Sequence, residues 1–521
     1  MGEKQRFMRN CLRNYADFMH SCRSVRKIAL FQTSKGVMIS RSSPFWETVL
    51  MEIEVKRFDV VGQLSFAELS GDFNPIHIDR ITARRLMFGQ PVVHGVHTLL
   101  WMLDRWLTGQ PAIRIRSLRS DFRNPARLHQ DVSFFATPTG EGQVRLEATT
   151  PTAGLVRANV EWRSADRTDE PMSNIPAKSP AKESAQLLLA NQISSAAGSL
   201  PLMFDRALAA AMFPNASAKL PGDQFAALLA STRVVGMRVP GLHSLLNALN
   251  LEDSSSTSGQ LAYSVEEFDE RFSRAIIHLH GDGLSGTATA FLRPTPVAQA
   301  GFTEASRSVT PGEFAKERVI VIGGSRGLGE IAVKQLTAGG ASVKFSYHVG
   351  EDDALRLAAD LGADSPTSCF QLDVLGDMGA LKELCRDFAP TMVCYFSTPP
   401  ITGAPRGKFS TPLFHELCQI YVEGFLRVFT AASSTGKLTS ILQPSSVAID
   451  ETPFGMTEYS AAKAAAETLL RALQKSHPKI RFHAPRWGRM PTDLTASITP
   501  GEVVDPVPVV LAALRQMKNT P

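Results

Sequence analysis

The chain has 521 residues, and at roughly 150 residues per domain this length predicts three or four folding units. Apolar residues make up 44% and charged residues 20%, which allows several buried cores and excludes a disordered chain. No apolar run reaches the ~18 residues that cross a bilayer. A net charge of +5 falls short of a nucleic-acid-binding signature. We therefore expect a globular protein with no membrane span and no nucleic-acid partner.

The cysteines are few, and none lies between Cys22 and Cys369. Their spacing matches neither a disulfide framework nor a zinc site, so we expect no structural metal. This usage is typical of a reducing compartment, and it predicts a cytoplasmic protein. The six positions are Cys11, Cys22, Cys369, Cys385, Cys394 and Cys418.

Residues 1–50 are basic and contain no continuous apolar core of the kind that a secretory signal needs. A transit peptide is one interpretation, although Glu3 and Asp17 count against it. The preferred interpretation is a variable basic N-terminal extension, because Met51 opens a clean domain. Removal of residues 1–50 is then expected to leave the activities of the chain intact.

Two stretches rich in Ser, Pro and charge, residues 164–184 and 294–317, read as linkers. They divide the remaining chain into residues 51–163, 185–293 and 318–521. The first part is expected to contain one apolar helix, at 93–107, and alternating strands such as those in 144–162. The second part repeats this order, with its helix expected at 240–251. The third part alternates strands and helices, which predicts βαβ units and a parallel sheet.

Three polar residues crowd into one turn of the first part. Asp72, Asn74 and His77 lie within six positions, and Pro75 prevents a regular helix through them. A carboxylate and an imidazole that reach one water form a general acid/base pair, able to add water to an activated double bond or remove it. The free amides at the start of the helix after Gly95 can polarise a thioester carbonyl. The alternative is that Asp72 and Asn74 only build the turn.

The segment SGDFNPIHIDRITARRLMFGQPVVHG, residues 70–95, resembles the MaoC-like (R)-specific enoyl-CoA hydratase family. The family pattern has a G-D-x-N-P-h-H core followed by F-G-x-P-h-h-H-G, and both are present. The resemblance implies a hot-dog fold with Asp72 and His77 as catalytic pair, Asn74 as orienting residue and Gly95 as oxyanion-hole amide. The second part resembles a degenerate hot-dog repeat without a catalytic set, which would make a double hot-dog with one empty half.

Two other features of these parts have a plain and a functional interpretation. His278 and His280 share a strand face and are expected to be structural or solvated, because no third metal ligand is evident. A run of arginines is either a solvated face or a seat for the phosphates of CoA or a carrier protein. The run comprises Arg114, Arg116, Arg119, Arg123 and Arg127.

The third part opens with RVIVIGGSRGLGE, a buried strand followed by glycines and a helix. This context favours a pyrophosphate at the helix N-terminus. The next strand ends without the acidic residue that holds a ribose 2′-hydroxyl, whereas Arg326 can pair with a 2′-phosphate. The sequence therefore predicts NADP(H) rather than NAD(H).

Further along, Tyr459 and Lys463 share a helix face at i and i+4, and Ser446 precedes them. A nearby ammonium is expected to lower the pKa of the phenol and make Tyr459 a proton donor to a carbonyl that Ser446 polarises. The alternative is a surface helix with an incidental Tyr and Lys.

Residues 318–521 resemble the short-chain dehydrogenase/reductase family, which implies an α/β Rossmann domain with a doubly wound parallel sheet. The resemblance implies catalytic roles for Ser446, Tyr459 and Lys463. It also implies that the cofactor binds at Gly323, Ser325, Arg326, Gly327, Leu328, Gly329, Asp373, Val374, Lys463 and Thr492. The chain departs from the family pattern at Tyr421, where many members have the Asn of a proton relay, and at Pro485-Arg486, where Pro-Gly is usual.

A ketoreductase makes the 3-hydroxyacyl thioester that a MaoC-like enzyme dehydrates, so the two resemblances imply consecutive reactions. We expect a bifunctional enzyme that reduces a 3-oxoacyl-CoA or acyl carrier protein thioester and dehydrates the product, as in fatty-acid or polyketide synthesis. One alternative is the degradative direction, hydration followed by NAD-linked oxidation. Another is a working hydratase joined to a non-catalytic nucleotide-binding scaffold, motivated by Tyr421. Both families are usually oligomeric, which implies a homodimer.

Overall fold

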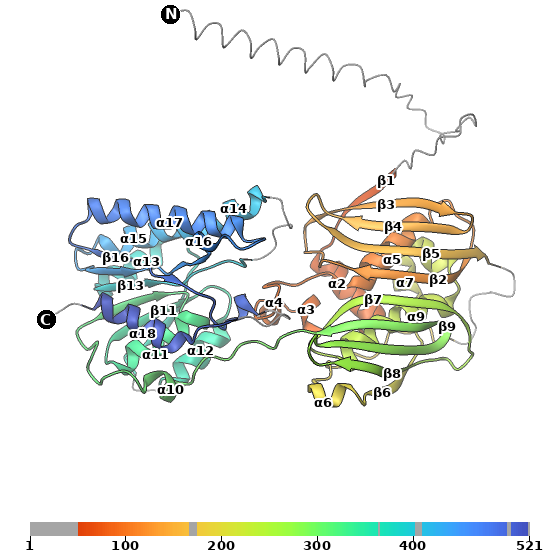
Figure 1. The fold of residues 1–521 in the computed structure, drawn as a ribbon, viewed down its shortest axis with the longest axis horizontal. Coiled ribbons are helices and arrows are strands. Elements are labelled where there is room, and N and C mark those ends of the chain that lie inside the picture. Colours follow the sequence, from red (N-terminus) through yellow and green to blue (C-terminus); the bar gives the residue numbers. More distant parts are fainter. Residues whose placement is uncertain (1–50, 166–174, 363–364, 402–408, 497–501, 519–521) are drawn as a thin grey trace, which may run out of the picture. The chain divides into compact units, whose positions relative to one another are not determined.

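The computed structural model describes residues 51–165, 175–362, 365–401, 409–496 and 502–518 (Figure 1). The predicted basic extension, residues 1–50, and part of the first predicted linker lie outside these ranges. No helix among the described residues is long and apolar enough to cross a membrane.

Residues 51–293 build one nine-stranded sheet with the order β1-β3-β4-β5-β2-β7-β9-β8-β6, and all its neighbouring strands are antiparallel. Strands β2 and β7 pair with each other and so join the two halves of this region, residues 51–163 and 185–293. Their register runs from Ser117↔Glu252 to Asp121↔Ala248. The strands are β1 Met51–Arg57, β2 Ile113–Phe122, β3 Asp131–Gly140, β4 Gln143–Thr149, β5 Gly154–Ser164, β6 Ala197–Pro201, β7 Ser244–Ser255, β8 Gln260–Asp269 and β9 Arg274–Leu292.

Two buried helices, α5 and α9, lie behind this sheet in Figure 1 and share one hydrophobic core with it. Helix α5 confirms the helix predicted at 93–107. The helices of this region are α2 Val60–Ser70, α3 Pro75–Ile78, α4 Arg80–Ala83, α5 Gly95–Trp106, α6 Ala190–Ile193, α7 Arg206–Met212, α8 Pro214–Lys219, α9 Gly222–Arg233 and the π-helical turn η2 Val234–Arg238.

The helix expected at 240–251 is wrong. That segment enters strand β7, and the helix of the second half is α9, earlier in the chain. The leucines at 242, 245, 246 and 249 have a helical spacing, but β7 is a central strand held by β2 on one side and β9 on the other. Nearly every residue of α9 is buried, so its sequence shows no polar face that would reveal a helix.

Residues 318–483 form a six-stranded parallel sheet with the order β12-β11-β10-β13-β14-β16, as expected for a doubly wound fold. Its strands are β10 Arg318–Ile322, β11 Ser342–Tyr347, β12 Ser368–Gln371, β13 Met392–Tyr395, β14 Ser440–Leu442 and β16 Arg481–His483, and a separate pair is β15 Ser445–Ser446 and β17 Arg486–Trp487. Alternate residues of β10 face opposite sides: Val319 and Val321 join one core, Ile320 and Ile322 the other.

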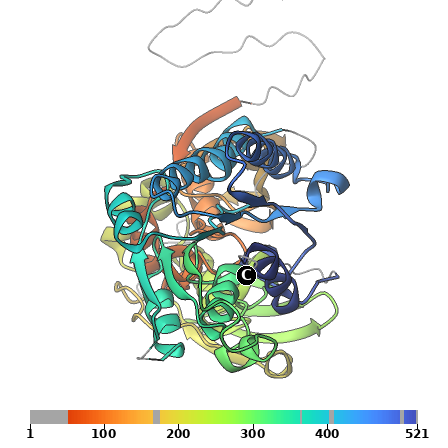
Figure 2. The same cartoon turned by 90° about the vertical axis from the view of Figure 1, so that its left-hand side faces the viewer.

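Helices cover both faces of the parallel sheet (Figure 2). Helices α11 and α18 pack together on one face, and α13 and α15 on the other. The helices are α10 Phe302–Ser306, α11 Gly327–Ala338, α12 Glu351–Asp360, α13 Gly379–Phe388, α14 Thr411–Cys418, α15 Phe425–Ser433, α16 Ala448–Glu451, α17 Thr457–Ser476 and α18 Pro506–Met517, with the short turns η3 Gln419–Gly424 and η4 Asp493–Thr495.

Candidate functional sites

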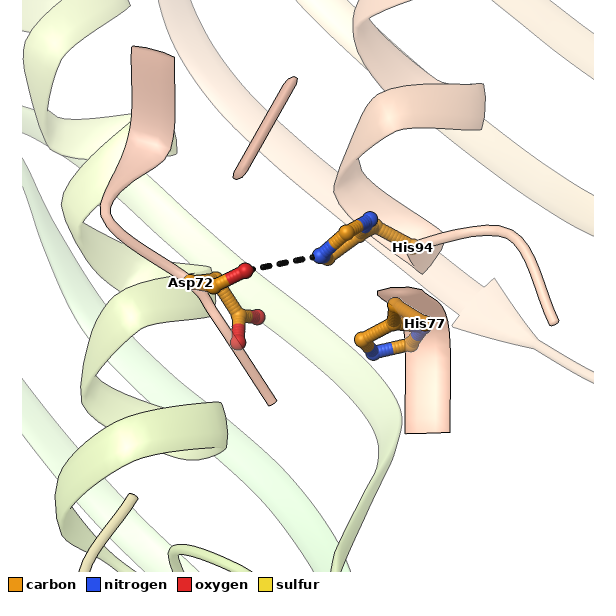
Figure 3. A group of neighbouring side chains, drawn as sticks. All are labelled: Asp72, His77 and His94. Carbon is orange, nitrogen blue, oxygen red and sulfur yellow. Dashed lines mark hydrogen bonds between the residues drawn. The ribbon is translucent and has the colours of Figure 1, made fainter. Parts of the chain in front are cut away.

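The turn that carries Asp72, Asn74 and His77 is fixed by the residues at its two ends. Helix α2 stops at Gly71, whose φ of 77° turns the chain into the left-handed region that glycine adopts without strain. Asn74 then caps α3, accepting a hydrogen bond from the amide of Ile76, and Pro75 begins that helix. The short helix presents His77 toward Asp72, as Figure 3 shows.

The Asp72 carboxylate is 1% exposed and accepts two hydrogen bonds. Its Oδ2 accepts one from Thr232 Oγ1 at 2.7 Å, and its Oδ1 accepts one from the amide of Asn74 at 3.2 Å. Burial raises the pKa of Asp72 above its ordinary value, and His77, Thr232 and Asn74 oppose that rise.

His77 presents one free ring nitrogen to Asp72. Its Nδ1 lies 2.8 Å from the carbonyl of Val92, a geometry that places the proton on Nδ1 and leaves the Nε2 lone pair open. Burial, assisted by His94, lowers the pKa of His77 to about 3, so the ring is neutral at pH 7. A neutral imidazole with an open Nε2 can accept a proton.

His94 completes a cluster that the sequence prediction did not include. Its ring stacks on His77 with the centroids 3.8 Å apart. Ligand atoms of Asp72, His77 and His94 all lie within 4.8 Å of one another. One His94 nitrogen lies 2.8 Å from Gln63 Oε1 and the other 3.0 Å from the Asp72 carbonyl (Figure 3), so a metal ion would have to displace one of these contacts.

Asn74 and Gly95 flank this cluster. The Asn74 side-chain nitrogen donates to the carbonyl of Gly236 at 2.9 Å, so this side chain contacts the turn η2. Gly95 is the first residue of α5, and its amide has no acceptor within the helix. A Cβ at Gly95 would stand 2.7 Å from Phe122 Cδ1, so any larger residue there would have to displace the Phe122 ring. Asp72, Asn74, His77 and Gly95 thus come from the α2–α3 segment and the start of α5. The side-chain nitrogen of Asn74 contacts η2 rather than the other three residues.

The glycine-rich loop after β10 has the close backbone packing that its sequence predicts. A Cβ at Gly329 would stand 2.2 Å from the carbonyl oxygen of Gly323. Gly323 and Gly327 have φ values of 75° and 60°, and a Cβ at Gly327 would meet only Thr492, at 3.9 Å. Helix α11 begins at Gly327, so its free amides open onto this space. These features fit a pyrophosphate.

The predicted residues of the reductase-like part line one pocket. They are Gly323, Ser325, Arg326, Gly327, Leu328, Gly329, Asp373, Val374, Ser446, Tyr459, Lys463 and Thr492. Within it, Arg326 Nη1 lies 3.1 Å from Asp493 Oδ2, an ion pair that a 2′-phosphate would have to replace. The Asp373 Oδ1 accepts a hydrogen bond from the Leu375 amide at 2.9 Å. The structure thus brings together residues that are far apart in the sequence.

The expected lowering of the Tyr459 pKa is wrong for this structure. Burial raises the pKa of the phenol above its ordinary value, and a hydrogen bond with Ser446 opposes the rise only in part. Lys463 Nζ lies 5.8 Å from the Tyr459 ring centroid and donates to the carbonyl of Pro444 at 2.8 Å. Burial lowers the pKa of Lys463 to about 7, partly opposed by Glu467, so the ammonium is also less available at neutral pH.

Tyr421 lies at the centre of this region, in the π-helical turn η3. Its side chain is 1% exposed, and its ring centroid lies 4.0 Å from Lys463 Nζ. Its carbonyl accepts a hydrogen bond from Gln443 Nε2 at 2.8 Å. A bulky ring and an occupied carbonyl stand where the sequence resemblance implies a relay residue.

The arginines of the predicted run have different environments in the structure. Arg114 forms ion pairs with Asp253 at 2.8 Å and with Asp223 at 3.4 Å, so it serves the joint between the halves. Arg119 and Arg123 are exposed. His278 is exposed on β9, with its Nε2 3.0 Å from Glu266.

Comparison with known proteins matches two separate parts of the chain. Residues 53–162 match the model of the MaoC like domain, and residues 317–503 match the short chain dehydrogenase model. The chain combines a MaoC-like dehydratase domain with a short-chain dehydrogenase domain. This confirms the fusion that the motifs predict.

Three curated relatives match shorter segments. The 3-hydroxybutyryl-CoA dehydratase of Methylorubrum extorquens is 38% identical over 84 residues, 16% of this chain and 51% of the relative. The (R)-specific enoyl-CoA hydratase of Aeromonas caviae is 46% identical over 55 residues, which are 11% of this chain and 40% of the relative. The cyclic-di-GMP-binding biofilm dispersal mediator protein of Escherichia coli is 38% identical over 78 residues, 14% and 33%. The alignments therefore span about a third to a half of these relatives' lengths.

Among solved structures, BdcA in complex with NADPH is similar at 23% identity, covering 39% of this chain and 88% of that one with a TM-score of 0.35.

Proposed function

We propose that the chain is a bifunctional acyl-thioester enzyme. Its short-chain dehydrogenase domain reduces a 3-oxoacyl thioester with NADPH, and its MaoC-like domain dehydrates the (R)-3-hydroxyacyl product to a trans-2-enoyl thioester. The observation that carries the proposal is that one chain holds both the Asp72/His77 pair and the Ser446/Tyr459/Lys463 set, whose reactions are consecutive. Residues 51–293 act as a double hot-dog, with one catalytic half and one that has no catalytic set of its own.

In the dehydration, the open Nε2 of neutral His77 accepts the proton from the carbon next to the thioester carbonyl. Asp72, whose raised pKa allows it to carry a proton, delivers one to the departing hydroxyl, which leaves as water. The Gly95 amide at the start of α5 stabilises the enolate oxygen that develops between these events. Hydration follows the same path in reverse.

When bound, NADPH would supply the hydride for the reduction. Tyr459 gives its phenolic proton to the carbonyl oxygen, and Ser446, hydrogen-bonded to Tyr459, orients that oxygen. The loop of Gly323, Gly327 and Gly329 would hold the pyrophosphate of the cofactor, and Arg326 would hold the 2′-phosphate in place of Asp493. The physiological carrier is CoA or an acyl carrier protein, and the enzyme is a homodimer.

The Tyr421 environment favours a second candidate, in which the dehydrogenase domain binds nucleotide as a scaffold for a working hydratase. The Tyr421 carbonyl is already paired with Gln443, and the Lys463 ammonium with Pro444.

A degradative enzyme that hydrates first and then oxidises with NAD uses the same residues in the opposite direction.

Two assays on the whole protein test the proposal. With acetoacetyl-CoA, we expect steady consumption of NADPH and slower consumption of NADH. With crotonyl-CoA, we expect hydration without any nucleotide. Hydration without reduction would favour the scaffold, faster turnover with NAD and 3-hydroxybutyryl-CoA would favour the degradative enzyme, and loss of both activities would contradict the proposal.

A further inference from the structure

Helix α9 and the turn η2, both from residues 185–293, contact the Asp72 carboxylate. Thr232, near the end of α9, is 4% exposed, and its hydroxyl donates to Asp72 Oδ2 at 2.7 Å. Gly236 follows in η2, and a Cβ built there would stand 2.3 Å from Asp72 Oδ1. Residues at least 160 positions further along the chain therefore fit around this carboxylate.

The same turn, η2, also contacts Asn74, two positions after Asp72. Asn74 Nδ2 donates to the carbonyl of Gly236 at 2.9 Å, and the carbonyls of Gly241 and Leu242 each lie 3.2 Å from it. The two halves share one continuous sheet through β2 and β7, so this contact is part of a single rigid core.

We propose that Thr232 is the positioning residue for Asp72, and that Gly236 leaves the space this carboxylate occupies. Residues 185–293, which have no catalytic set of their own, thereby complete the site of residues 51–163. The inference rests on the dehydratase activity proposed above and assigns a role to residues outside the region that matches the MaoC like domain.

Physical chemistry gives the hydroxyl a specific task. Asp72 Oδ1 is held by the amide of Asn74, and Thr232 supplies the donor to Oδ2. A buried carboxylate that loses a donor is costly in its charged form, so its pKa rises and its rotamer is less fixed. A hydrogen bond to a charged group is among the stronger ones in proteins.

Thr232→Val tests this task, because valine keeps the shape and removes the hydroxyl. We expect kcat for crotonyl-CoA hydration to fall about ten- to a hundredfold, while NADPH-dependent reduction is unchanged. The limb of the pH profile that reports Asp72 should move about one unit to higher pH. Thr232→Ser, which keeps the hydroxyl, should restore both the rate and the position of that limb.

Ser231→Ala is the matched control. Ser231 is buried on the same helix, but its hydroxyl donates to the Leu228 carbonyl at 2.8 Å and does not meet Asp72. We expect less than a threefold change in hydration. Gly236→Ala, which places a methyl group against Asp72, should lose hydration more than a hundredfold and keep reduction.

A Thr232→Val enzyme with the wild-type rate and pH profile would overturn the inference. So would an equal loss in Ser231→Ala, or a slower Thr232→Val enzyme whose pH limbs do not move, since either result would indicate packing alone. A wild-type protein that does not hydrate crotonyl-CoA would defeat the proposed function itself, and this inference with it.

Discussion

The Lys463 ammonium lies over the ring of Tyr421, with Nζ 4.0 Å from the ring centroid. Both side chains are buried, and the same ammonium donates to the Pro444 carbonyl at 2.8 Å. An ammonium in such surroundings has lost most of its water, which lowers its pKa to about 7 although Glu467 opposes the change. This position has consequences for stability as well as for catalysis.

The first prediction concerns Lys463→Met and pH. Between pH 7 and about 10.4, the unfolded chain binds a proton that folded Lys463 has released, so this residue makes the free energy of unfolding rise with pH. Methionine removes the titration. We expect the free energy of unfolding of Lys463→Met to exceed that of the wild type by on the order of 2 kcal/mol at pH 6.5, and this difference to shrink toward pH 10.

Denaturant unfolding at several pH values measures this difference. Lys479, an exposed residue on the same part of the chain, provides the control as Lys479→Met, which should show a flat difference. A Lys463→Met advantage that stays constant from pH 6.5 to pH 10 would contradict the buried ammonium.

The second prediction concerns Gly329→Ala. Its Cβ would stand 2.2 Å from the Gly323 carbonyl oxygen, so the loop must open. We expect the Kd for NADPH to rise at least a hundredfold in a fluorescence titration, because the loop amides lose their convergence on the pyrophosphate. Gly301→Ala, whose Cβ meets nothing within 4 Å, should bind NADPH as the wild type does. Tight binding by both variants would show that the pyrophosphate lies elsewhere.

The third prediction concerns Arg326→Gln and cofactor choice. If the guanidinium leaves Asp493 to hold a 2′-phosphate, the substitution should raise the Kd for NADPH ten- to a hundredfold and that for NADH less than threefold. An equal loss for both nucleotides would mean that Arg326 supports the loop and does not select the phosphate.

Local motifs point to the candidate residues of both sites, but not to the side chains and backbone groups that contact them in the structure. The segment 70–95 indicates Asp72 and His77 as candidates, because the spacing of residues within one turn is a local property of the sequence. Thr232 and Gly236 carry no such signal, since their role depends on a contact across 160 positions. The helix of residues 185–293 is hard to locate from sequence for a related reason. Helix α9 is buried on nearly every side, so its sequence has no alternation of polar and apolar faces, whereas the leucines around the start of β7 have a helical spacing.

The electrostatics were the least predictable from sequence. The i, i+4 spacing of Tyr459 and Lys463 is correct, yet burial raises the pKa of the phenol, because desolvation acts on Tyr459 more strongly than its partners do. His94 was visible in the motif, but its stacking on His77 depends on how α3 meets the start of α5.

The fourth prediction concerns the joint between the halves. Gln224 on α9 accepts from the amide of Ile115 and donates to its carbonyl, both at 2.8 Å. Gln224→Leu leaves these two buried backbone groups unpaired, so we expect the free energy of unfolding to fall by about 2–4 kcal/mol. The exposed Gln143→Leu should change it by less than ~0.5 kcal/mol. Equal effects would contradict this role of Gln224.

The central claim is that one chain carries two independent sites for consecutive reactions. Its most direct test measures both activities in two variants, Asp72→Asn and Tyr459→Phe, with acetoacetyl-CoA plus NADPH for reduction and crotonyl-CoA for hydration. We expect Asp72→Asn to lose hydration at least a hundredfold and to reduce at the wild-type rate, and Tyr459→Phe to lose reduction and keep hydration. Joint loss of both activities in either variant, or retention of both, would contradict it.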